Sequence, residues 1–411
     1  MDALLDEVKV SSPIASLVRP WGWTPHYMRS SPRLLVRVLR GILKLSVIPA
    51  SVRGSSSLAF RMVLPMGQVP PAMCGGRQVP AALLLSSGSL VSMVNYSRTK
   101  KLNLVLARMS RTLRLVRPLN MPFNIMIEPT NVCNLKCPAC PTGSDRLPFE
   151  KGRMSFGEFR TLVDELGPYA TYAQLWGFGE PFLHPEILDM VTYCKEFDME
   201  VRISTNGQFL GDTRSAERLV GSGLNSLKIS LDGATQETLQ KYRVNASFDR
   251  ILDGIRQINE AKTRCASKHP RLILQFIVMK HNQHEIPRMK ELAAELKMKY
   301  KQKTVWVEED TAEDFLPEKN HSRFFIDPKT QALRPTKQRL GLCPFPWDWA
   351  MVNWDGTVVP CCKDPYRYHL FGNVFEQNYR TIWRSKEFAD FRKRLLRNPS
   401  RVKKCNRCVF S

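Results

Sequence analysis

Acidic residues are scarce in the first third of this 411-residue chain. Residues 8–127 contain no Asp or Glu, although 17 Lys and Arg occur there. After subtraction of the three negative charges of Asp2, Asp6 and Glu7, residues 1–127 carry about +14 of the chain's formal charge of +23. Most of the positive charge therefore lies outside the body of the chain, which counts against a basic nucleic-acid-binding surface on that body.

Long apolar runs are also scarce. Residues 78–97 form a stretch of twenty without charge, but Pro80 and five serines make it a poor membrane-spanning candidate. The acidic residues that follow Met1 are unlike a secretory signal. Eleven cysteines occur in clusters, and a chain of this length needs no disulfides. We therefore expect a cytoplasmic, reducing location.

Residues 1–92 form a basic extension rich in Arg, Ser and Pro. We favour a disordered or non-native extension, with Met93 as a plausible start. Arg33–Ile48 has the pattern of a basic amphipathic helix, so a peripheral membrane anchor or a transit-like segment are the alternatives. Residues 93–120 are predicted to be a basic helical lead-in, with a helix over Lys100–Arg117 that packs on the next domain.

From residue 121 the pattern alternates between short apolar, β-branched runs and helical periodicity. The predicted strands are Phe123–Glu128, Ala173–Phe178, Glu200–Thr205, Ser226–Leu231, Leu272–Met279 and Thr304–Val307. Six such repeats predict an α/β fold, a partial (β/α)6 TIM-like barrel over residues 121–310. Its active site would lie at the C-terminal ends of the strands.

A linker over residues 311–342 would join this barrel to a small α+β domain over residues 343–411. Asn353–Thr357 predicts a β-hairpin in that domain, because Asp355-Gly356 is a preferred type I′ turn pair.

Three cysteines, Cys133, Cys137 and Cys140, follow the first predicted strand on one short loop. A structural zinc ion needs four closed ligands, which usually come as two separate pairs. Three thiolates on one loop suit an iron–sulfur cluster in which one iron remains open. This C-x3-C-x2-C spacing resembles the radical S-adenosylmethionine (SAM) enzymes. The resemblance implies a [4Fe-4S] cluster on these thiols, with SAM on the fourth iron.

Further strand ends resemble the same family. Gly177-Phe178-Gly179-Glu180 follows the second strand and is similar to a motif whose backbone carbonyls hold the SAM ammonium, although Phe178 replaces a glycine. The resemblance assigns Gly177, Gly179 and Glu180 to cofactor binding.

The third and fourth strands end in short polar residues, which can bind ribose hydroxyls at the mouth of a barrel. The resemblance places Ser204 and Asn206 near the SAM ribose and adds Ser230 to the cofactor-binding set. It also assigns Arg243 to the SAM carboxylate, since a guanidinium can bind a carboxylate through two donors. Ile277–Met279 would pack against the adenine.

A second group of cysteines closes the chain: Cys343, Cys361, Cys405 and Cys408. Their spacing alone fits zinc or iron–sulfur. The stretch from Cys343 to Cys361 resembles the SPASM extension of radical SAM enzymes. In its shortened, twitch-type form this implies one auxiliary [4Fe-4S] cluster, which would relay electrons. Cys362 is treated as a spare thiol, and the choice between Cys361 and Cys362 stays open.

The resemblance implies an enzyme that cleaves SAM reductively and uses the 5′-deoxyadenosyl radical to take hydrogen from a peptide or small molecule. The result would be a net oxidation or bond-forming modification. The electron would come from a small donor such as flavodoxin or ferredoxin. The alternative is a basic protein that binds zinc through its C-terminal cysteines and also binds nucleic acid. An acidic stretch after the sixth strand, Glu308–Asp310, is interpreted as a solvated loop rather than a catalytic base.

Overall fold

The computed structural model describes residues 73–74, 77–78, 96–211, 213–336, 342–406 and 408. The chain divides into two units, Met1–Leu83 and Leu84–Ser411. In the first, the described residues form a two-stranded antiparallel ladder, β1 (Met73–Cys74) with β2 (Arg77–Gln78). The predicted helix Arg33–Ile48 and most of the uncharged run at 78–97 lie outside the described residues. No helix in the described ranges is long and apolar enough to cross a membrane.

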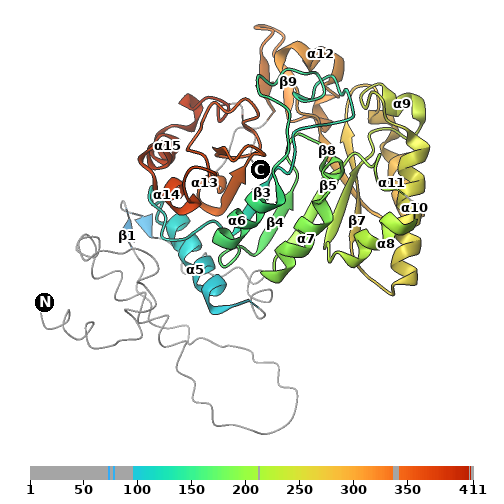
Figure 1. The fold of residues 1–411 in the computed structure, drawn as a ribbon. Helices are drawn as coiled ribbons and strands as arrows, with labels where there is room; N and C mark the ends of the chain where they lie inside the picture. Colours follow the sequence, from blue (N-terminus) through green and yellow to red (C-terminus); the bar gives the residue numbers. More distant parts are fainter. Residues whose placement is uncertain are drawn as a thin grey trace, which may run out of the picture. The chain divides into compact units, whose positions relative to one another are not determined.

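The second unit contains an eight-stranded sheet in the order β12-β11-β3-β4-β5-β6-β7-β8 (Figure 1). Its strands are β3 (Asn124–Ile127), β4 (Tyr172–Leu175), β5 (Glu200–Thr205), β6 (Ser226–Ser230), β7 (Arg271–Val278), β8 (Lys299–Thr304), β11 (Trp349–Val352) and β12 (Val358–Val359). All neighbouring pairs from β11 to β8 are parallel, and only the β11–β12 pair of this sheet is antiparallel.

Helices alternate with the parallel strands along the chain (Figure 1). They are α6 (Phe156–Leu166), α7 (Ile187–Glu196), α8 (Thr213–Gly221), α9 (Gln236–Gln240), α10 (Phe248–Arg264) and α11 (Ile286–Glu295). The predicted capping box forms at the start of α6, where Ser155 and Glu158 satisfy each other's free backbone donors. This alternation confirms the predicted α/β partial barrel.

The two faces of this sheet differ in composition. On the face that the helices cover, the strands place aliphatic side chains that are at most 4% exposed: Ile125, Ile127, Ala173, Leu175, Val201, Ile203, Leu227, Ile229, Leu272 and Leu274. Successive side chains of a strand point to opposite faces. The opposite face, called the inner face below, is mixed. It carries polar residues in matching register, together with the apolar residues Met126, Met351, Ile273 and Ile277. The polar residues are Gln174, Arg202, Ser204, Lys228, Ser230, Gln275, Lys301 and Lys303.

The lead-in helix is α5 (Arg98–Thr112), which is shorter than the predicted Lys100–Arg117. It ends where Arg114 takes a positive φ of 53°. The Asn103 amide donates to Met121 O at 2.9 Å and accepts from Met121 N at 2.9 Å, which fixes α5 against the segment that leads into β3. The predicted packing role of this helix is therefore confirmed.

One strand prediction was wrong. The sixth strand is Lys299–Thr304, not Thr304–Val307. β8 lies at the edge of the sheet, where its lysines reach solvent, so it has no apolar run to mark it. The apolar run belongs to the segment after the strand, where Val305 and Val307 are buried.

The C-terminal segment does not form a sheet of its own. Its predicted hairpin is present as β11 and β12, and β11 extends the barrel sheet by pairing in parallel with β3. The predicted type I′ turn was wrong, because only Gly356 has a positive φ (80°) and Asp355 does not. Asn353 and Thr357 flank a three-residue loop in which Gly356 N donates to Asn353 O at 3.0 Å.

Smaller elements complete the unit. They are α12 (Ala312–Phe315), β9 (Phe324–Ile326), β10 (Leu333–Pro335), α13 (Phe345–Asp348), α14 (Tyr379–Arg384), α15 (Lys386–Arg397) and the 3₁₀ helices Pro181–Leu183, Gln283–Glu285, Glu309–Thr311, Lys319–His321 and Pro399–Arg401. β9 and β10 form a separate two-stranded sheet within the segment predicted as a linker.

Candidate active site

The three clustered cysteines lie on the loop that leaves the C-terminal end of β3. This loop is held by the backbone: Lys136 N donates to Val244 O at 3.1 Å, and Cys140 N donates to Cys137 O at 3.1 Å. Gly143 lies so close that a Cβ there would come within 2.6 Å of Cys137 N. All three cysteines are free thiols, and Cys137 is buried.

Electrostatics links the three thiols to one another and to Arg243. Burial raises the pKa of Cys137 to about 12, the Arg243 charge lowers it, and the neighbouring Cys140 and Cys133 raise it. Burial likewise raises the pKa of Cys133. Three soft sulfur donors on one loop are a donor set that fits iron–sulfur chemistry. No group of three or more His, Cys, Asp or Glu in the described part is arranged to hold a metal ion.

The glycine-rich turn after β4 packs directly against the segment that leads to the cysteines. A Cβ at Gly177 would lie 2.3 Å from Glu128 Oε1, and one at Gly179 would lie 2.2 Å from Thr130 O. Phe178 N donates to Glu128 Oε1 at 2.7 Å. Glycine is therefore required at both positions by close approach, whereas Phe178 at the middle position is accommodated.

Glu180 joins the ends of β4 and β5. Its carboxylate, 2% exposed, accepts from Thr205 Oγ1 at 2.7 Å and from Asn206 N at 2.7 Å. Burial raises the pKa of Glu180, and these hydrogen bonds lower it. Asn206 in turn donates to Asn134 Oδ1 at 2.8 Å, with its Nδ2 3.9 Å from Cys133 Sγ. The carboxylate thus positions Asn206 over the cysteine loop.

Arg243 is held by a buried carboxylate outside the predicted set of site residues. Asp232, which is fully buried, accepts from Arg243 Nε at 2.7 Å and pairs with its Nη2 at 2.6 Å. Asp232 Oδ1 also accepts from Ile277 N at 2.7 Å. Burial alone lowers the pKa of Arg243, but the Asp232 charge raises it above its usual range. Asp232 therefore fixes both the guanidinium and the end of β7.

Two serines of the predicted set lie on the inner face. Ser204 is half-buried on β5, in register with Lys228. Ser230, near the end of β6, is buried and accepts from Gln275 Nε2 at 3.3 Å. The structure therefore brings the strand-end residues and the cysteine loop to one edge of the sheet.

Sequence reasoning missed Glu128, and it is a second anchor of this edge. Its carboxylate is 2% exposed and accepts from Phe178 N and, at 3.5 Å, from Trp354 N of the hairpin loop. Burial raises the pKa of Glu128 to about 7, although both hydrogen bonds and the Arg367 charge lower it. A lone carboxylate at a strand end gave no local signal for this role.

The C-terminal cysteines also gather, and they include the thiol that was treated as a spare. Burial raises the pKa of Cys361 well above its usual range, and the neighbouring Cys362, Cys343 and Cys405 raise it further. Cys408 acts in the same way on Cys362. Cys362 packs against the cluster of Met126, Met351 and Val359.

The acidic stretch after β8 is engaged in ion pairs. Asp310 pairs with Arg146 at 2.6 Å, and Arg146 also donates to Pro138 O within the cysteine loop. Glu308 pairs with Lys404 at 2.9 Å, next to Cys405. These carboxylates link the barrel to both cysteine regions.

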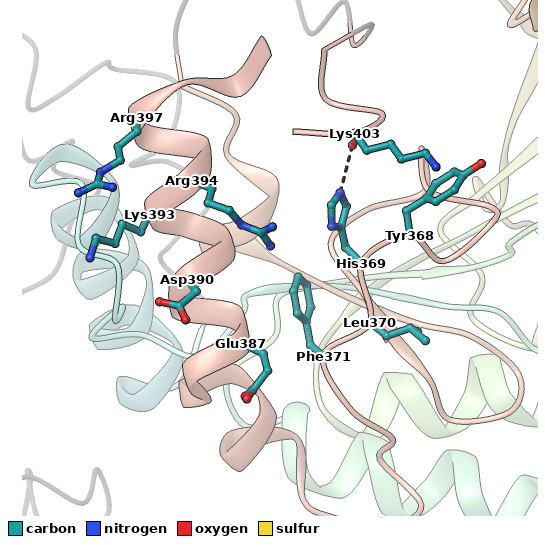
Figure 2. Close-up of a pocket in the computed structure, with 10 residues that line it drawn as sticks. All are labelled: Tyr368, His369, Leu370, Phe371, Glu387, Asp390, Lys393, Arg394, Arg397 and Lys403. Carbon is teal, nitrogen blue, oxygen red and sulfur yellow. Dashed lines mark hydrogen bonds between the residues drawn. The ribbon is translucent and has the colours of Figure 1, made fainter. Parts of the chain in front are cut away.

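A surface hollow of about 930 Å³ lies over α15 and the Tyr368–Phe371 segment. Figure 2 shows basic side chains of α15 on one side and Lys403 on the other, whose carbonyl lies 3.1 Å from His369 Nε2. None of the predicted site residues lines this hollow.

Comparison with known proteins bears on both cysteine regions. The family model of the radical SAM superfamily matches residues 127–293, and that of the SPASM iron–sulfur cluster-binding domain matches residues 343–409. The first domain implies a [4Fe-4S] cluster with SAM, and the second implies auxiliary iron–sulfur clusters. The alternative of a zinc and nucleic-acid-binding protein is therefore set aside.

Curated relatives include two proteins of Methanosarcina barkeri. The chain is 31% identical over 170 residues to the Fe-coproporphyrin III synthase, a match that covers 41% of this chain and 40% of that protein. It is 27% identical over 332 residues to the AdoMet-dependent heme synthase, with 71% and 89% covered. Mycofactocin maturase MftC of Mycobacterium tuberculosis is 30% identical over 145 residues, with 35% and 36% covered.

Among solved structures, Streptococcus suis SuiB bound to S-adenosylmethionine aligns with a TM-score of 0.52 at 14% identity, covering 70% of this chain and 72% of that chain. At this identity the likeness concerns the fold. The two family models fall on the two cysteine regions. The chain therefore belongs to the radical SAM superfamily of enzymes and carries a C-terminal SPASM iron–sulfur domain.

Proposed function

We propose that Cys133, Cys137 and Cys140 hold the [4Fe-4S] cluster and that SAM lies across the adjoining strand ends. The observation that carries this proposal is the convergence of three free thiols with Asn206 and Arg243 at one edge of a parallel sheet. Active sites of α/β barrels lie at this edge.

The remaining SAM contacts follow from the same edge. The backbone of the turn at Gly177 and Gly179 is assigned to the SAM amino group; the two glycines let this turn pack against Glu128 and Thr130, and Glu180 positions it relative to Asn206. Ser204 and Ser230 face the same side and offer hydroxyls to the ribose.

Arg243 binds the SAM carboxylate, held in place by Asp232. A guanidinium with five donors can serve two carboxylates at once, so this pairing leaves donors for the ligand. Asp232 is therefore a positioning residue for SAM.

The cofactors supply the chemistry that side chains cannot. The cluster and SAM, once bound, would supply one-electron cleavage of SAM to methionine and a 5′-deoxyadenosyl radical able to take a hydrogen atom from the substrate. The chain's own residues orient SAM. The electron comes from a small donor of the flavodoxin or ferredoxin type.

The C-terminal thiols Cys343, Cys361, Cys405 and Cys408 hold one auxiliary [4Fe-4S] cluster, which supplies an acceptor for the electron that the substrate radical loses. The outcome is a net oxidation or a bond-forming modification. Support comes from the electrostatic interaction of Cys361 with Cys343 and Cys405 and from the match of residues 343–409 to the SPASM iron–sulfur domain.

The substrate class follows from the relatives' names. They include a maturase, a heme synthase and SuiB bound to its precursor peptide SuiA. A peptide or a small molecule is therefore proposed as the substrate.

The test is SAM cleavage by the full chain, reconstituted with iron and sulfide without oxygen and then reduced. Wild type should release 5′-deoxyadenosine. Cys137→Ala should fall to the protein-free background and lose about half of the bound iron, since two four-iron clusters are proposed. Cys265→Ala, which removes an exposed cysteine, is the matched control and should behave as wild type. Undiminished cleavage by Cys137→Ala would refute the assignment.

A further inference from the structure

Three lysines from two strands share the inner face of the sheet. Lys228 lies on β6, with Ser204 and Ile273 as its register partners. Lys301 and Lys303 lie on β8, opposite Gln275 and Ile277 of β7. Register partners of parallel strands point to the same face. The three side chains, called the lysine cluster below, therefore project from the same face as the serines of the SAM site.

The three charges act on one another. Burial lowers the pKa of Lys228 to about 7, and the charges of Lys303, Lys301 and Arg202 lower it further. Lys301 and Lys303 are exposed at the edge of the sheet, yet partial desolvation still lowers the pKa of Lys303, with Lys301 and Lys363 adding to the effect. Aromatic faces offset part of this repulsion, since Lys228 Nζ lies 4.6 Å from the centroid of the Trp176 ring.

Within the described ranges, no carboxylate pairs with the cluster. In residues 96–211, 213–336 and 342–406, no Asp or Glu forms an ion pair with Lys228, Lys301 or Lys303. Glu200, on the neighbouring strand, pairs instead with Arg202 and Arg271. Glu308 pairs with Lys404. Like charges held together without counter-charge are unfavourable, and an anionic ligand relieves this.

The position of the cluster points to the substrate rather than to SAM. Lys228 precedes Ser230 by two residues on β6, so it lies deeper on the same face than the strand end. Lys301 is level with Ser230, and Lys303 is level with Ile277 near the end of β7. Cys362 acts electrostatically on both Lys228 and Lys303. The cluster therefore adjoins both the strand-end site and a C-terminal thiol, where a hydrogen donor to a SAM-derived radical would need to be held.

We propose that Lys228, Lys301 and Lys303 bind an oxyanion of the substrate, a carboxylate or a phosphate, on the inner face of the sheet. The assignment of the bound oxyanion to the substrate rests on the proposed function. Ammonium groups form strong charge-assisted hydrogen bonds with such oxyanions. The substrate is then an anionic molecule or a peptide that presents an acidic side chain.

The test is calorimetric titration of the reconstituted full chain with citrate and, separately, with pyrophosphate, at an ionic strength kept constant with NaCl. At least one anion should bind saturably. Lys228→Gln and Lys303→Gln should each weaken binding about tenfold or more, the usual effect of losing one hydrogen bond to a charged group. Lys290→Gln, which removes an exposed charge from α11 on the opposite face, is the matched control and should bind as wild type.

A preference for citrate would assign a carboxylate, and a preference for pyrophosphate would assign a phosphate. Saturable binding by neither anion, or equal binding by Lys228→Gln and Lys290→Gln, would overturn the proposal. Binding of anions by the iron-free chain but not by the reconstituted chain would also overturn the proposal. The lysines would then balance the charge of the auxiliary cluster instead of binding the substrate.

Peptide mass spectrometry after limited acylation at pH 7.5 locates the site independently, because a bound anion should protect Lys228 and not Lys290. Failure of the proposed function would be recognised separately. A chain that binds these anions but releases no 5′-deoxyadenosine contradicts the radical chemistry alone. A chain that cleaves SAM but binds neither anion contradicts the lysine cluster alone.

Discussion

The two faces of the central sheet perform different tasks. The face under α7 and α10 is aliphatic, with side chains such as Val201, Leu227 and Leu274 fully buried. The inner face carries Arg202, Lys228 and other polar side chains at the alternating positions of the same strands. Parallel strands buried on both faces read as continuous apolar runs. Here the strands from β5 to β8 alternate, so the main apolar layer lies on the helix-covered face, and the inner face has a smaller buried cluster of Met126, Met351 and Val359.

This difference teaches where stability and chemistry reside. The helix-covered face gains free energy from apolar burial. The inner face instead holds groups whose charged forms are unfavourable in the fold, as the pKa values of about 7 for Glu128 and Lys228 indicate. Such groups gather at functional sites.

The largest expected effect is on the helix-covered face. Leu274→Ala should lower the free energy of unfolding by about 2–5 kcal/mol, because it leaves a cavity in a fully buried layer. Ile273→Ala removes a side chain of similar size from the preceding position of β7. Ile273 is half-buried on the inner face. Urea unfolding should show a clearly smaller loss for Ile273→Ala. Equal losses would contradict the division between the two faces.

A second effect comes from the buried carboxylate of Glu128. Its pKa is about 7 in the fold against an ordinary value of 4.5, so between these values the folded protein holds a proton that the unfolded chain releases. The free energy of unfolding should therefore fall as pH rises from about 4.5 to 7. At about 1.4 kcal/mol for each pKa unit, this group accounts for at most about 3 kcal/mol.

Glu128→Gln isolates this contribution. The variant keeps an acceptor for Phe178 N but has no proton to lose. Unfolding measured at pH 5 and pH 7.5 should show a smaller decrease for the variant than for wild type, while other carboxylates act equally in both. If the free energy of unfolding fell equally in Glu128→Gln and in wild type between pH 5 and pH 7.5, Glu128 would not be the source of the decrease.

Local patterns predicted the cysteine loop and most of the barrel. Cys133 and Cys140 lie within eight residues of sequence, and β5 was predicted with its observed bounds. The capping box of α6 was equally visible, because Ser155 and Glu158 are three residues apart. In each case the residues that interact are near one another in the chain.

The missed features depend on residues that only the topology brings together. Glu128 contacts Phe178 and Trp354, which are 50 and 226 residues away in sequence. Lys228 and Lys303 share a face through two strand registers. β8 was misplaced because an exposed edge strand carries charged residues where a buried strand would carry apolar ones.

The smallest expected effect is at the ion pair that links the inner side to the C-terminal segment. Glu308 and Lys404 are partly exposed and 2.9 Å apart, and such pairs contribute about 0.2–1 kcal/mol. Glu308→Gln should therefore lower the free energy of unfolding by no more than about 1 kcal/mol, and the loss should shrink in 1 M NaCl because salt screens exposed charges. A double-mutant cycle with Lys404→Gln measures the pair itself. A coupling as large as the loss in Leu274→Ala would mean that the inner side contributes to stability as the helix-covered face does, and the contrast between the two faces would fail.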